Sequence, residues 1–353
     1  MKYQKRSGIS LFEHENTMDS LSNMGNPLVV LKDIIDFEQF RSMLESLFAN
    51  DHKKSKAGGK PIDPVFMLKV LFLQRLYNIS DHQIEYQIKD RMSFREFLDI
   101  QSVDDVPDEK TVWKYRDIMS ESGIGERLFA KFNEHLNSMG LIVNEGKIID
   151  ASFVIVPKQR NTREENKKIK DGEGDELWND HPHKKCHKDI DARWTQKGGS
   201  NYYGYKDHAK VDLKTKIITD FIVTPANVHD SQAIESLIGK GRDKKGEHLF
   251  LDSAYVGYED VITKQKLVPE IIEKNYRNTQ LTDEQKESNR NKARKRCRIE
   301  HAFGFMEQSM KGLFFRGVGI LRAKFYIGFT NLVYNMCRLV QIKKYHPEFV
   351  KCN

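Results

Sequence analysis

The stretch that decides the fold is GKIIDASFVIVP, residues 146–157. It is short, apolar and rich in β-branched residues, which favour strands. The chain before it follows helical patterns, so the periodicity changes at about residue 145. Asp150 interrupts the apolar run, and a carboxylate there costs free energy unless it is paired or binds a cation. The stretch therefore predicts a strand that carries a candidate site.

The segments downstream alternate between strand and helix patterns. They predict two strands joined by a turn near Lys214, a helix, a short buried strand ending at Asp252 with a turn and a helix after it, another strand and a long helix: YYGYKDHAKVDL (202–213), KIITDFIVTPA (216–226), HDSQAIESLIG (229–239), HLFLDSAYVGYED (248–260), VPEIIE (268–273) and residues 282–310. This order predicts an α/β domain with a mixed sheet flanked by helices.

A polar stretch at about residues 158–200 shows little periodicity and is rich in Lys, Asn, Asp, Glu and Gly. We expect a mobile insertion or loop there. It contains HPHKKCH (181–187), whose residue types can bind zinc, but their spacing matches no standard zinc finger. A structural metal site in this stretch is therefore disfavoured.

The first 140 residues read as helical. Residues 1–60 hold a polar lead and an amphipathic segment at 31–48, followed by a loop at 54–61. Residues 61–140 predict short helices, the first beginning near Pro64. Three helix starts are predicted from capping residues, namely Ser80 with Gln83, Ser93 with Glu96, and Asp108. The piece from Ser80 to Arg116 fits a helix-turn-helix variant, with an ordinary helical bundle as the alternative.

The charge is uneven along the chain. The formal net charge is +7 and the pI is about 8.9, but six of the nine residues from Arg290 to Arg298 are Lys or Arg. A second basic stretch covers residues 158–170. Such clusters favour a polyanionic partner, most simply nucleic acid, although a solvated helix face is the alternative.

The composition also bears on location. The four cysteines have no pairing rhythm, which suits a reducing cytosol. The first residues lack the apolar core of a signal peptide, and the most apolar run, VFMLKVLFLQRLY (65–77), is too short and too charged to span a bilayer. We expect a cytoplasmic protein with no membrane partner.

Three acids suggest the chemistry. Asp150 and Asp252 interrupt apolar strands, and Glu300 follows the basic run on the predicted long helix. If the strands are neighbours and the helix packs on them, the three carboxylates can meet. Hard oxygen ligands suit Mg²⁺ or Mn²⁺, and two such ions can drive an in-line phosphoryl displacement. The alternative is that both aspartates cap the turns that follow their strands.

At these residues the sequence resembles the DDE transposases of bacterial insertion sequences, specifically the insertion-sequence-five (IS-five) group. The stretches that carry the resemblance are IIDASFV, YYGYKDHAKVD, VTPANVHD, LDSAYVGY and RCRIEHAFG. The helical part that contains VFMLKVLFLQRLYNISDHQIEYQI also resembles the domain that precedes the catalytic core in this family. The resemblance covers about residues 60–340, and five motifs in order are far more specific than one.

The resemblance implies an RNase H-like catalytic domain at 145–340, preceded by an all-α DNA-binding and dimerisation domain at 61–140. It implies that Asp150, Asp252 and Glu300 bind two divalent ions, Mg²⁺ or Mn²⁺. The expected activity is cleavage of double-stranded DNA at terminal inverted repeats, followed by joining of the freed 3′-hydroxyl to target DNA. Synapsis of two ends implies a homodimer or a larger assembly.

Basic residues are expected to hold the DNA. Arg296 lies one helical turn before Glu300 and Arg298 two residues before it, and a guanidinium can grip a phosphate with two hydrogen bonds. The family match suggests that Lys206 and His208 lie near the catalytic sheet, and for His208 a solvent-facing strand residue is the alternative. The residues expected to contact DNA are Lys114, Arg116, Lys206, His208, Arg294, Arg296, Arg298 and Lys311.

The sequence departs from related transposases in one place. Those proteins often carry Tyr seven residues before the Glu and Lys seven residues after it, where this chain has Ala293 and Glu307. Lys311 is expected to substitute, three helical turns from Glu300 and on the same side. Two other functions stay open, namely a DNA-binding regulator without catalysis and a metal-dependent nuclease without strand transfer. The sequence has no Walker-type loop, so nucleotide hydrolysis is not expected.

Overall fold

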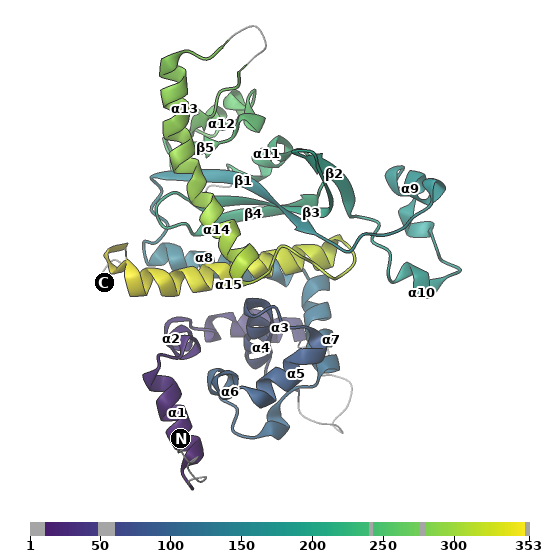
Figure 1. Ribbon diagram of the computed structural model, residues 1–353, viewed down its shortest axis with the longest axis vertical. Helices are drawn as coiled ribbons and strands as arrows, with labels where there is room; N and C mark the ends of the chain where they lie inside the picture. Colours follow the sequence, from purple (N-terminus) through teal and green to yellow (C-terminus); the bar gives the residue numbers. More distant parts are fainter. Residues whose placement is uncertain (1–10, 49–60, 240–242, 276–279, 350–353) are drawn as a thin grey trace, which may run out of the picture. The chain divides into compact units, whose positions relative to one another are not determined.

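The computed structural model describes residues 11–48, 61–239, 243–275 and 280–349 (Figure 1). Contacts divide the chain into two compact units, and each is described by itself. The first unit holds residues up to Gln74 and those from Ile79 to Tyr115, and the second holds residues 75–78 and everything from Arg116 onward. The loop predicted at 54–61 falls almost wholly outside the described residues.

The first unit is helical, as predicted. Its helices are α1 (Glu13–Asn23), α2 (Pro27–Ile34), α3 (Arg41–Phe48), α4 (Pro64–Leu76), α5 (Asp81–Asp90), α6 (Met92–Leu98) and α7 (Glu109–Glu121), the last of which runs on into the second unit. Phe37, Phe72 and Phe97 meet ring against ring in its interior. The single amphipathic helix predicted at 31–48 is wrong in extent, because the backbone turns extended at Ile35 and the chain forms two helices.

The predicted helix caps have different outcomes. Asp108 caps α7 as predicted, since its Oδ1 accepts the Thr111 backbone N–H at 2.7 Å. Ser80 occupies the N-cap position of α5, but its side chain makes no capping hydrogen bond within the described residues. The Ser93 prediction is wrong, because α6 begins one residue earlier at Met92 and places the serine inside the helix.

The second unit is built on a mixed sheet, which confirms the predicted fold class. Its strands are β1 (Gly146–Ile155), β2 (Arg193–Lys197), β3 (Ser200–Asp212), β4 (Ile218–Pro225), β5 (His248–Leu251) and β6 (Val268–Ile271). The central strands follow the order β4-β3-β1-β5-β6, with antiparallel pairing from β4 to β1 and parallel pairing from β1 to β6. The strand β2 pairs with the first residues of β3.

Helices cover both faces of this sheet. They are α8 (Ile124–Ser138), α11 (Ile234–Leu237), α12 (Glu259–Lys264), α13 (Asp283–Arg296), α14 (Glu300–Gly304) and α15 (Ile320–Tyr345). The long helix expected at 282–310 is present but broken by a 3₁₀ turn at Cys297–Ile299 and a π-helical turn at Phe305–Ser309. Among the described residues, no helix is both long and apolar enough to cross a membrane.

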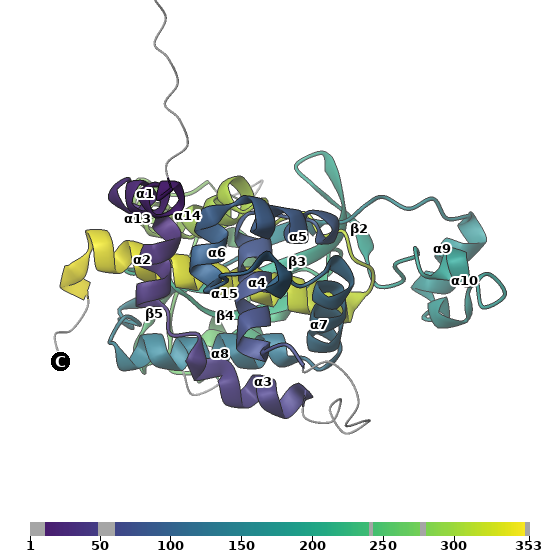
Figure 2. The ribbon, with the colours of Figure 1, turned by 90° about the horizontal axis from the view of Figure 1, so that it is seen from below.

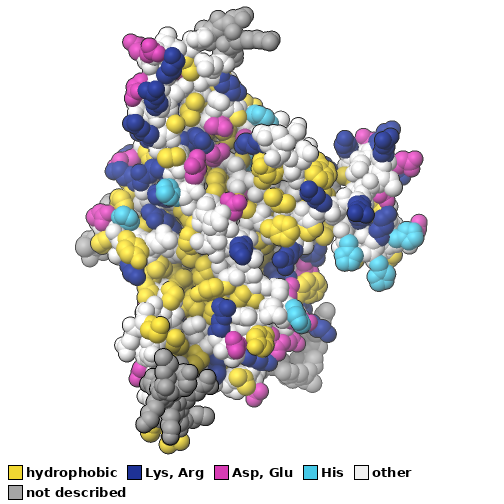
Figure 3. Space-filling view, viewed as in Figure 1, with side chains coloured by type: hydrophobic (Ala, Val, Ile, Leu, Met, Phe, Trp, Pro, Cys, Tyr) yellow, Lys and Arg dark blue, Asp and Glu magenta, His cyan; other side chains and the backbone are white. Residues whose placement is uncertain are grey.

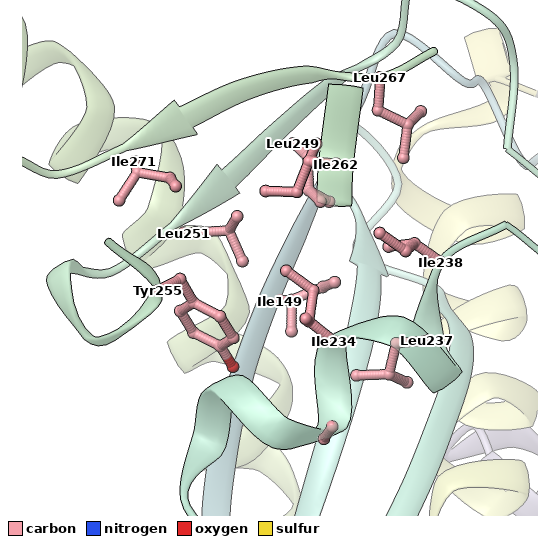
Figure 4. Packing of buried hydrophobic residues seen from close by; sticks show 11 residues of the cluster. Ile149, Ile234, Leu237, Ile238, Leu249, Leu251, Tyr255, Ile262, Leu267 and Ile271 are labelled. Carbon is pink, nitrogen blue, oxygen red and sulfur yellow. The ribbon is translucent and has the colours of Figure 1, made fainter. Parts of the chain in front are cut away.

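Strand pairing decides which face each side chain takes. Ile149 lies opposite Lys210 and Asp150 lies opposite Ala209 in the β1–β3 ladder. Because consecutive residues of a strand point to opposite faces, Ile149 and Asp150 belong to different layers. Ile149 joins an apolar cluster with residues of β5, α11, α12 and the loops beside them, including Leu249, Leu251 and Tyr255 (Figure 4).

The opposite face packs on α8 and α15, which lie side by side (Figures 1 and 2). Asn335 on α15 donates to Asn133 on α8 at 2.9 Å and to the Ile218 carbonyl at 2.8 Å, so the two helices are tied to β4. The helical domain predicted at 61–140 includes residues 124–138. By contacts they belong to the second unit, because α8 packs on α15.

The segment 158–200 is not a loop, and that expectation is corrected. It contains α9 (Arg163–Lys170), α10 (Pro182–Lys185) and β2, and Thr162 starts α9 with a capping box. Figures 1 and 2 both show α9 and α10 beyond the β2 end of the sheet. Asp189 anchors the segment, since it is buried and accepts the Tyr205 hydroxyl at 2.8 Å and the Gly319 N–H at 3.1 Å. Hydrophobic periodicity gives no signal in this polar segment, so the sequence pattern did not indicate that Asp189 anchors it.

Asp207 is buried on the α15 face of β3. The Asn331 side-chain amide donates to its Oδ1 at 3.2 Å. Burial, opposed by this hydrogen bond, raises the pKa of Asp207 to about 7. Between about pH 4 and pH 7, Asp207 therefore keeps its proton in the folded chain and has lost it in the unfolded chain.

This proton predicts a pH dependence of stability. An ordinary aspartate has a pKa of about 4, so the stability contributed by protonated Asp207 is full below about pH 4 and lost as the pH passes about 7. Asp207→Asn keeps the acceptor for Asn331 and cannot ionise. Relative to this variant, the wild type should lose on the order of 1–3 kcal/mol of unfolding free energy between about pH 4.5 and 8 in urea titrations. Parallel pH curves for the two proteins would contradict the assignment.

A second prediction concerns the approach of α15 to the sheet. A Cβ on Gly328 would lie 2.7 Å from Cζ of the buried Phe221 ring, too close for an unstrained contact. Gly328→Ala should lower the unfolding free energy by about 1–3 kcal/mol because the core must shift. The control is Gly304→Ala in α14, where a Cβ meets no described atom within 4 Å. That variant should be neutral or stabilising by up to about 1 kcal/mol.

Candidate active site

The register of the parallel strands brings two of the predicted acids together. Ile148 pairs with Phe250 across β1 and β5. Asp150 lies two residues after Ile148, and Asp252 lies two residues after Phe250. Both carboxylates therefore fall on the same face and at the same level of the sheet. Asp252 also caps the turn after β5, because its Oδ1 accepts the Ala254 N–H at 2.8 Å. Asp252 therefore fits both interpretations, since it caps a turn and also lies beside Asp150.

Arg296 and Glu300 face these carboxylates from the helices above the sheet. In Figure 1, α13 and α14 cross in front of β1. The Nη1 of Arg296 donates to Oδ2 of Asp150, and its Nη2 lies 3.8 Å from Oε1 of Glu300. The guanidinium thus bridges the strand acid and the helix acid. The side chain of Glu300 is 65% exposed, whereas that of Asp150 is 16% exposed.

The helix α13 is held in this place by polar contacts, and all of its residues are exposed or half-buried. Gln285 donates to Glu273 at 2.7 Å, Lys292 donates to the Ile271 carbonyl at 3.0 Å, and Arg296 reaches Asp150. Gln285, Lys292 and Arg296 are separated by seven and then four positions, so they share one side of the helix. A polar stripe replaces the apolar stripe that usually docks a helix on a sheet.

The charge of Asp150 depends on its neighbours. Burial raises the pKa of Asp150, the Arg296 guanidinium opposes that rise, and Asp252 adds to it by repulsion. A buried carboxylate that loses its partner destabilises a fold more than an exposed one. Over the described ranges, including residues 181–187, no three His, Cys, Asp or Glu side chains are grouped closely enough to hold a metal ion. A cationic side chain occupies the place beside Asp150.

The residues of the site nevertheless fit a divalent cation. Tyr255 is fully buried, and its hydroxyl has no hydrogen-bond partner among the described residues. Burial raises the pKa of Tyr255, and the carboxylates Asp230, Asp150 and Asp252 raise it further. An unpartnered buried hydroxyl costs about 1–3 kcal/mol. Carboxylate oxygens are the ligands that Mg²⁺ and Mn²⁺ prefer, and Asp150, Asp252 and Glu300 are carboxylates on one side of the sheet.

Lys206 and His208 lie on the other face of the sheet, which corrects their expected role. Lys206 is buried and donates to Oδ1 of Asp230 at 2.7 Å and to the Val228 carbonyl at 2.8 Å. His208 is fully buried, its Nε2 lies 2.8 Å from the Thr224 hydroxyl, and burial lowers its pKa to about 4. Both side chains are buried, and the β1–β3 register turns them away from Asp150.

The basic run presents its other arginines to solvent. Arg294 and Arg298 are exposed, and Lys295 lies 4.9 Å above the Phe250 ring. Figure 3 shows Lys and Arg side chains gathered along α13, with acidic side chains next to them. DNA contacts by Arg294, Arg296 and Arg298 stay predictions.

Lys311 does not take the place predicted for it. The π-helical turn at Phe305–Ser309 changes the helical phase, and the helix has ended before Lys311, whose φ is 46°. Its side chain is exposed, but it is not on the same side of one continuous helix as Glu300. The prediction assumed three regular helical turns between Glu300 and Lys311. The backbone instead contains a π-helical turn, and Lys311 itself is left-handed.

Lys114 and Arg116 lie on α7, the last helix of the predicted helix-turn-helix. Two helical residues that are two apart point about 200° from each other, so they face different sides. Lys114 is exposed and Arg116 half-buried. Their DNA contacts stay predictions.

Known proteins agree with this architecture. Residues 144–336 match the family described as the transposase DDE domain, and residues 15–117 match the family described as a transposase domain (DUF772). The first match spans more than half of the chain. This chain belongs to the DDE transposase family. That match contains Asp150, Asp252 and Glu300, and the other covers the helical unit of this transposase.

A solved structure also resembles the transposase, though distantly. It is a cryo-electron-microscopy structure of the piggyBac transposase synaptic complex with hairpin DNA. The TM-score is 0.48 at 9% sequence identity, and the alignment covers 95% of this chain and 78% of that one.

Sequence reasoning missed two residues of the site. Asp230 stands in the quoted VTPANVHD motif, but its pairing with Lys206 was not foreseen. Tyr255 follows Asp252 by three residues, and its ring packs in the apolar cluster. Its hydroxyl has no hydrogen-bond partner among the described residues, and its pKa is raised by burial and by Asp230, Asp150 and Asp252. The sequence did offer one signal, because Tyr255 belongs to the same LDSAYVGY motif as Asp252.

The contact between Arg296 and Asp150 yields a stability prediction. Arg296→Gln removes the cation from a buried carboxylate and should lower the unfolding free energy by about 1–3 kcal/mol without divalent ions. The matched control is Arg294→Gln on the same helix, where the side chain is exposed. It should change stability by no more than about 0.5 kcal/mol. Urea unfolding at pH 8 measures both, and equal midpoints for the two variants would contradict the proposed charge balance.

Proposed function

We propose that this transposase is catalytically active and that Asp150, Asp252 and Glu300 hold two divalent cations, Mg²⁺ or Mn²⁺. The observation that carries the proposal is the pair Asp150 and Asp252, held at one level of the sheet with the Arg296 guanidinium where a cation would bind. Membership of the DDE family supports the same assignment. When bound, such ions activate the attacking oxygen and stabilise the leaving oxygen of a phosphodiester.

The proposed reaction has two displacements. In the first, water attacks the phosphorus at the element end, and the bond to the 3′-oxygen breaks to release a 3′-hydroxyl and a 5′-phosphate. In the second, that 3′-hydroxyl attacks a target phosphodiester, loses its proton, and displaces a target 3′-oxygen, which gains one. No cofactor is oxidised or reduced, and the number of phosphodiester bonds is conserved in the joining step.

Arg296 has two proposed partners in this cycle. Without ions it neutralises Asp150, and with ions bound it is free to grip a phosphate through two N–H groups. The exposed Arg294 and Arg298 on either side of it attract the backbone without reading sequence. Binding by this run should therefore weaken steeply as salt rises.

Recognition and assembly complete the proposal. The helical unit, with Lys114 and Arg116 at its last helix, is proposed to bind terminal inverted repeats in double-stranded DNA and to support dimerisation. Synapsis of two ends requires a homodimer or a larger assembly. The IS-five group assignment and the cytoplasmic location are part of this proposal.

A cleavage assay tests the proposal. Supercoiled plasmid carrying the two element ends is incubated with Mg²⁺ or Mn²⁺ and with wild type or Asp252→Ala. The wild type should release 3′-hydroxyl ends and form joined products, while the variant should lose at least about a thousandfold in rate and keep DNA binding. The matched control is Asp260→Ala, an exposed aspartate on α12, which should cleave like the wild type.

Other outcomes select the rival functions. Binding without nicks by the wild type would indicate a regulator that lacks catalysis. Nicks without joined products would indicate a nuclease without strand transfer. Equal cleavage by wild type and Asp252→Ala would remove Asp252 from the mechanism.

A further inference from the structure

The Tyr255 hydroxyl is the polar group of the site that the proposed chemistry has not used. Its ring is fully buried and packs at the edge of the apolar cluster with Leu251 and Ile271. In Figure 4 the hydroxyl oxygen points away from these aliphatic side chains. It has no hydrogen-bond partner among the residues that the structure describes. Buried hydroxyls in folded proteins nearly always have a partner, so the exception needs a cause.

The surroundings of this hydroxyl contain acceptors. Asp252 caps the turn that carries Tyr255, and this turn packs against the turn that begins at Asp230. Burial raises the pKa of the hydroxyl, and Asp230, Asp150 and Asp252 also raise it. Ionised carboxylates only accept hydrogen bonds, so the tyrosine must be the donor. Donors already engage each of these acids. Lys206 donates to Oδ1 of Asp230, and the Ala254 N–H donates to Oδ1 of Asp252. Both oxygens of Asp150 are engaged, Oδ1 by the Ala151 N–H and Oδ2 by Arg296. The hydroxyl, which has no partner among the described residues, is therefore a free donor near acids that already accept hydrogen bonds from other groups.

We infer that Tyr255 is a positioning residue whose hydroxyl donates a hydrogen bond to the carboxylate cluster, or to water bound there, once a divalent cation replaces the Arg296 guanidinium at Asp150. The inference rests on the proposed metal site. The tyrosine orients the oxygens that hold the cation and does not itself touch the reacting phosphate. Donors behind metal ligands commonly fix ligand direction in this way.

This role separates Tyr255 from a tyrosine that only fills the core. In the ion-free structure the hydroxyl makes no hydrogen bond within the described residues, so removing it should not weaken the ion-free fold. If the hydroxyl is used only when a cation is bound, its removal should weaken cation binding. A packing role predicts the reverse pattern, because it depends on the ring and not on the ion.

The experiment is Mn²⁺ titration of the full chain, followed by calorimetry and by the electron paramagnetic resonance of free Mn²⁺. Tyr255→Phe keeps the ring and removes the hydroxyl. The matched control is Tyr258→Phe, a half-buried tyrosine against the same cluster, three residues on. Tyr255→Phe should raise the Kd for Mn²⁺ about tenfold and leave the melting temperature of the ion-free protein unchanged or slightly higher. Tyr258→Phe should leave the Kd at the wild-type value.

The outcomes separate failure of this inference from failure of the metal site. If wild type binds Mn²⁺ and loses it in Asp252→Ala, while Tyr255→Phe binds as wild type does, the metal site stands and the role of Tyr255 is overturned. A lower ion-free melting temperature for Tyr255→Phe with unchanged Kd overturns it too, in favour of packing. If the wild type binds no better than Asp252→Ala, the metal site fails and this inference fails with it.

Discussion

The structure of the site depends on one electrostatic constraint, the charge of Asp150 inside an apolar strand. Burial makes that charge costly, and the guanidinium of Arg296 offsets the cost from the helix above. The contact fixes the end of α13 over β1 and brings Glu300 to the same side. Because α13 has no buried side of its own, its polar stripe must follow acceptors that the sheet presents. The acid that would hold a cation in catalysis is thus also what positions the helix in its absence.

The sheet separates two kinds of polar chemistry by its faces. The face of Asp150 and Asp252 opens toward α13 and α14, whereas Lys206, His208 and Lys210 lie on the other face and are engaged within the fold. Lys210, for example, donates to the Leu237 carbonyl at 2.7 Å and to Asp243 at 2.8 Å. These buried ammonium groups satisfy the loops that cross the sheet and add nothing to the surface charge that DNA would meet. The sequence motif around Lys206 is therefore structural in its contacts, although it borders Asp230 and the Tyr255 hydroxyl.

The family assignment and the geometry bear on different questions. Matches over 144–336 and 15–117 make the chain a DDE transposase, but they do not say how its acids are balanced without ions. The geometry answers that question. Arg296 pairs with Asp150, and the Tyr255 hydroxyl has no hydrogen-bond partner within the part of the chain that the structure describes. Both features fit the proposed exchange, in which a divalent cation would displace Arg296 from Asp150 and the Tyr255 hydroxyl would help to orient the carboxylates.

The sequence by itself determined the order of strands and helices in the core and the three acids. Local β-propensity marks β1, and an acid in an apolar run signals a site wherever the strand lies. It did not determine which face Lys206 and His208 take, because that depends on the pairing of β1 with a strand about fifty residues away. Nor could it foresee the π-turn before Lys311 or the helices within 158–200, whose anchor Asp189 is polar and far from its partner Gly319. Propensity and side-chain chemistry act over a few residues and were legible in the sequence. Register, facing and charge balance arise between distant segments, and only the tertiary structure decided them.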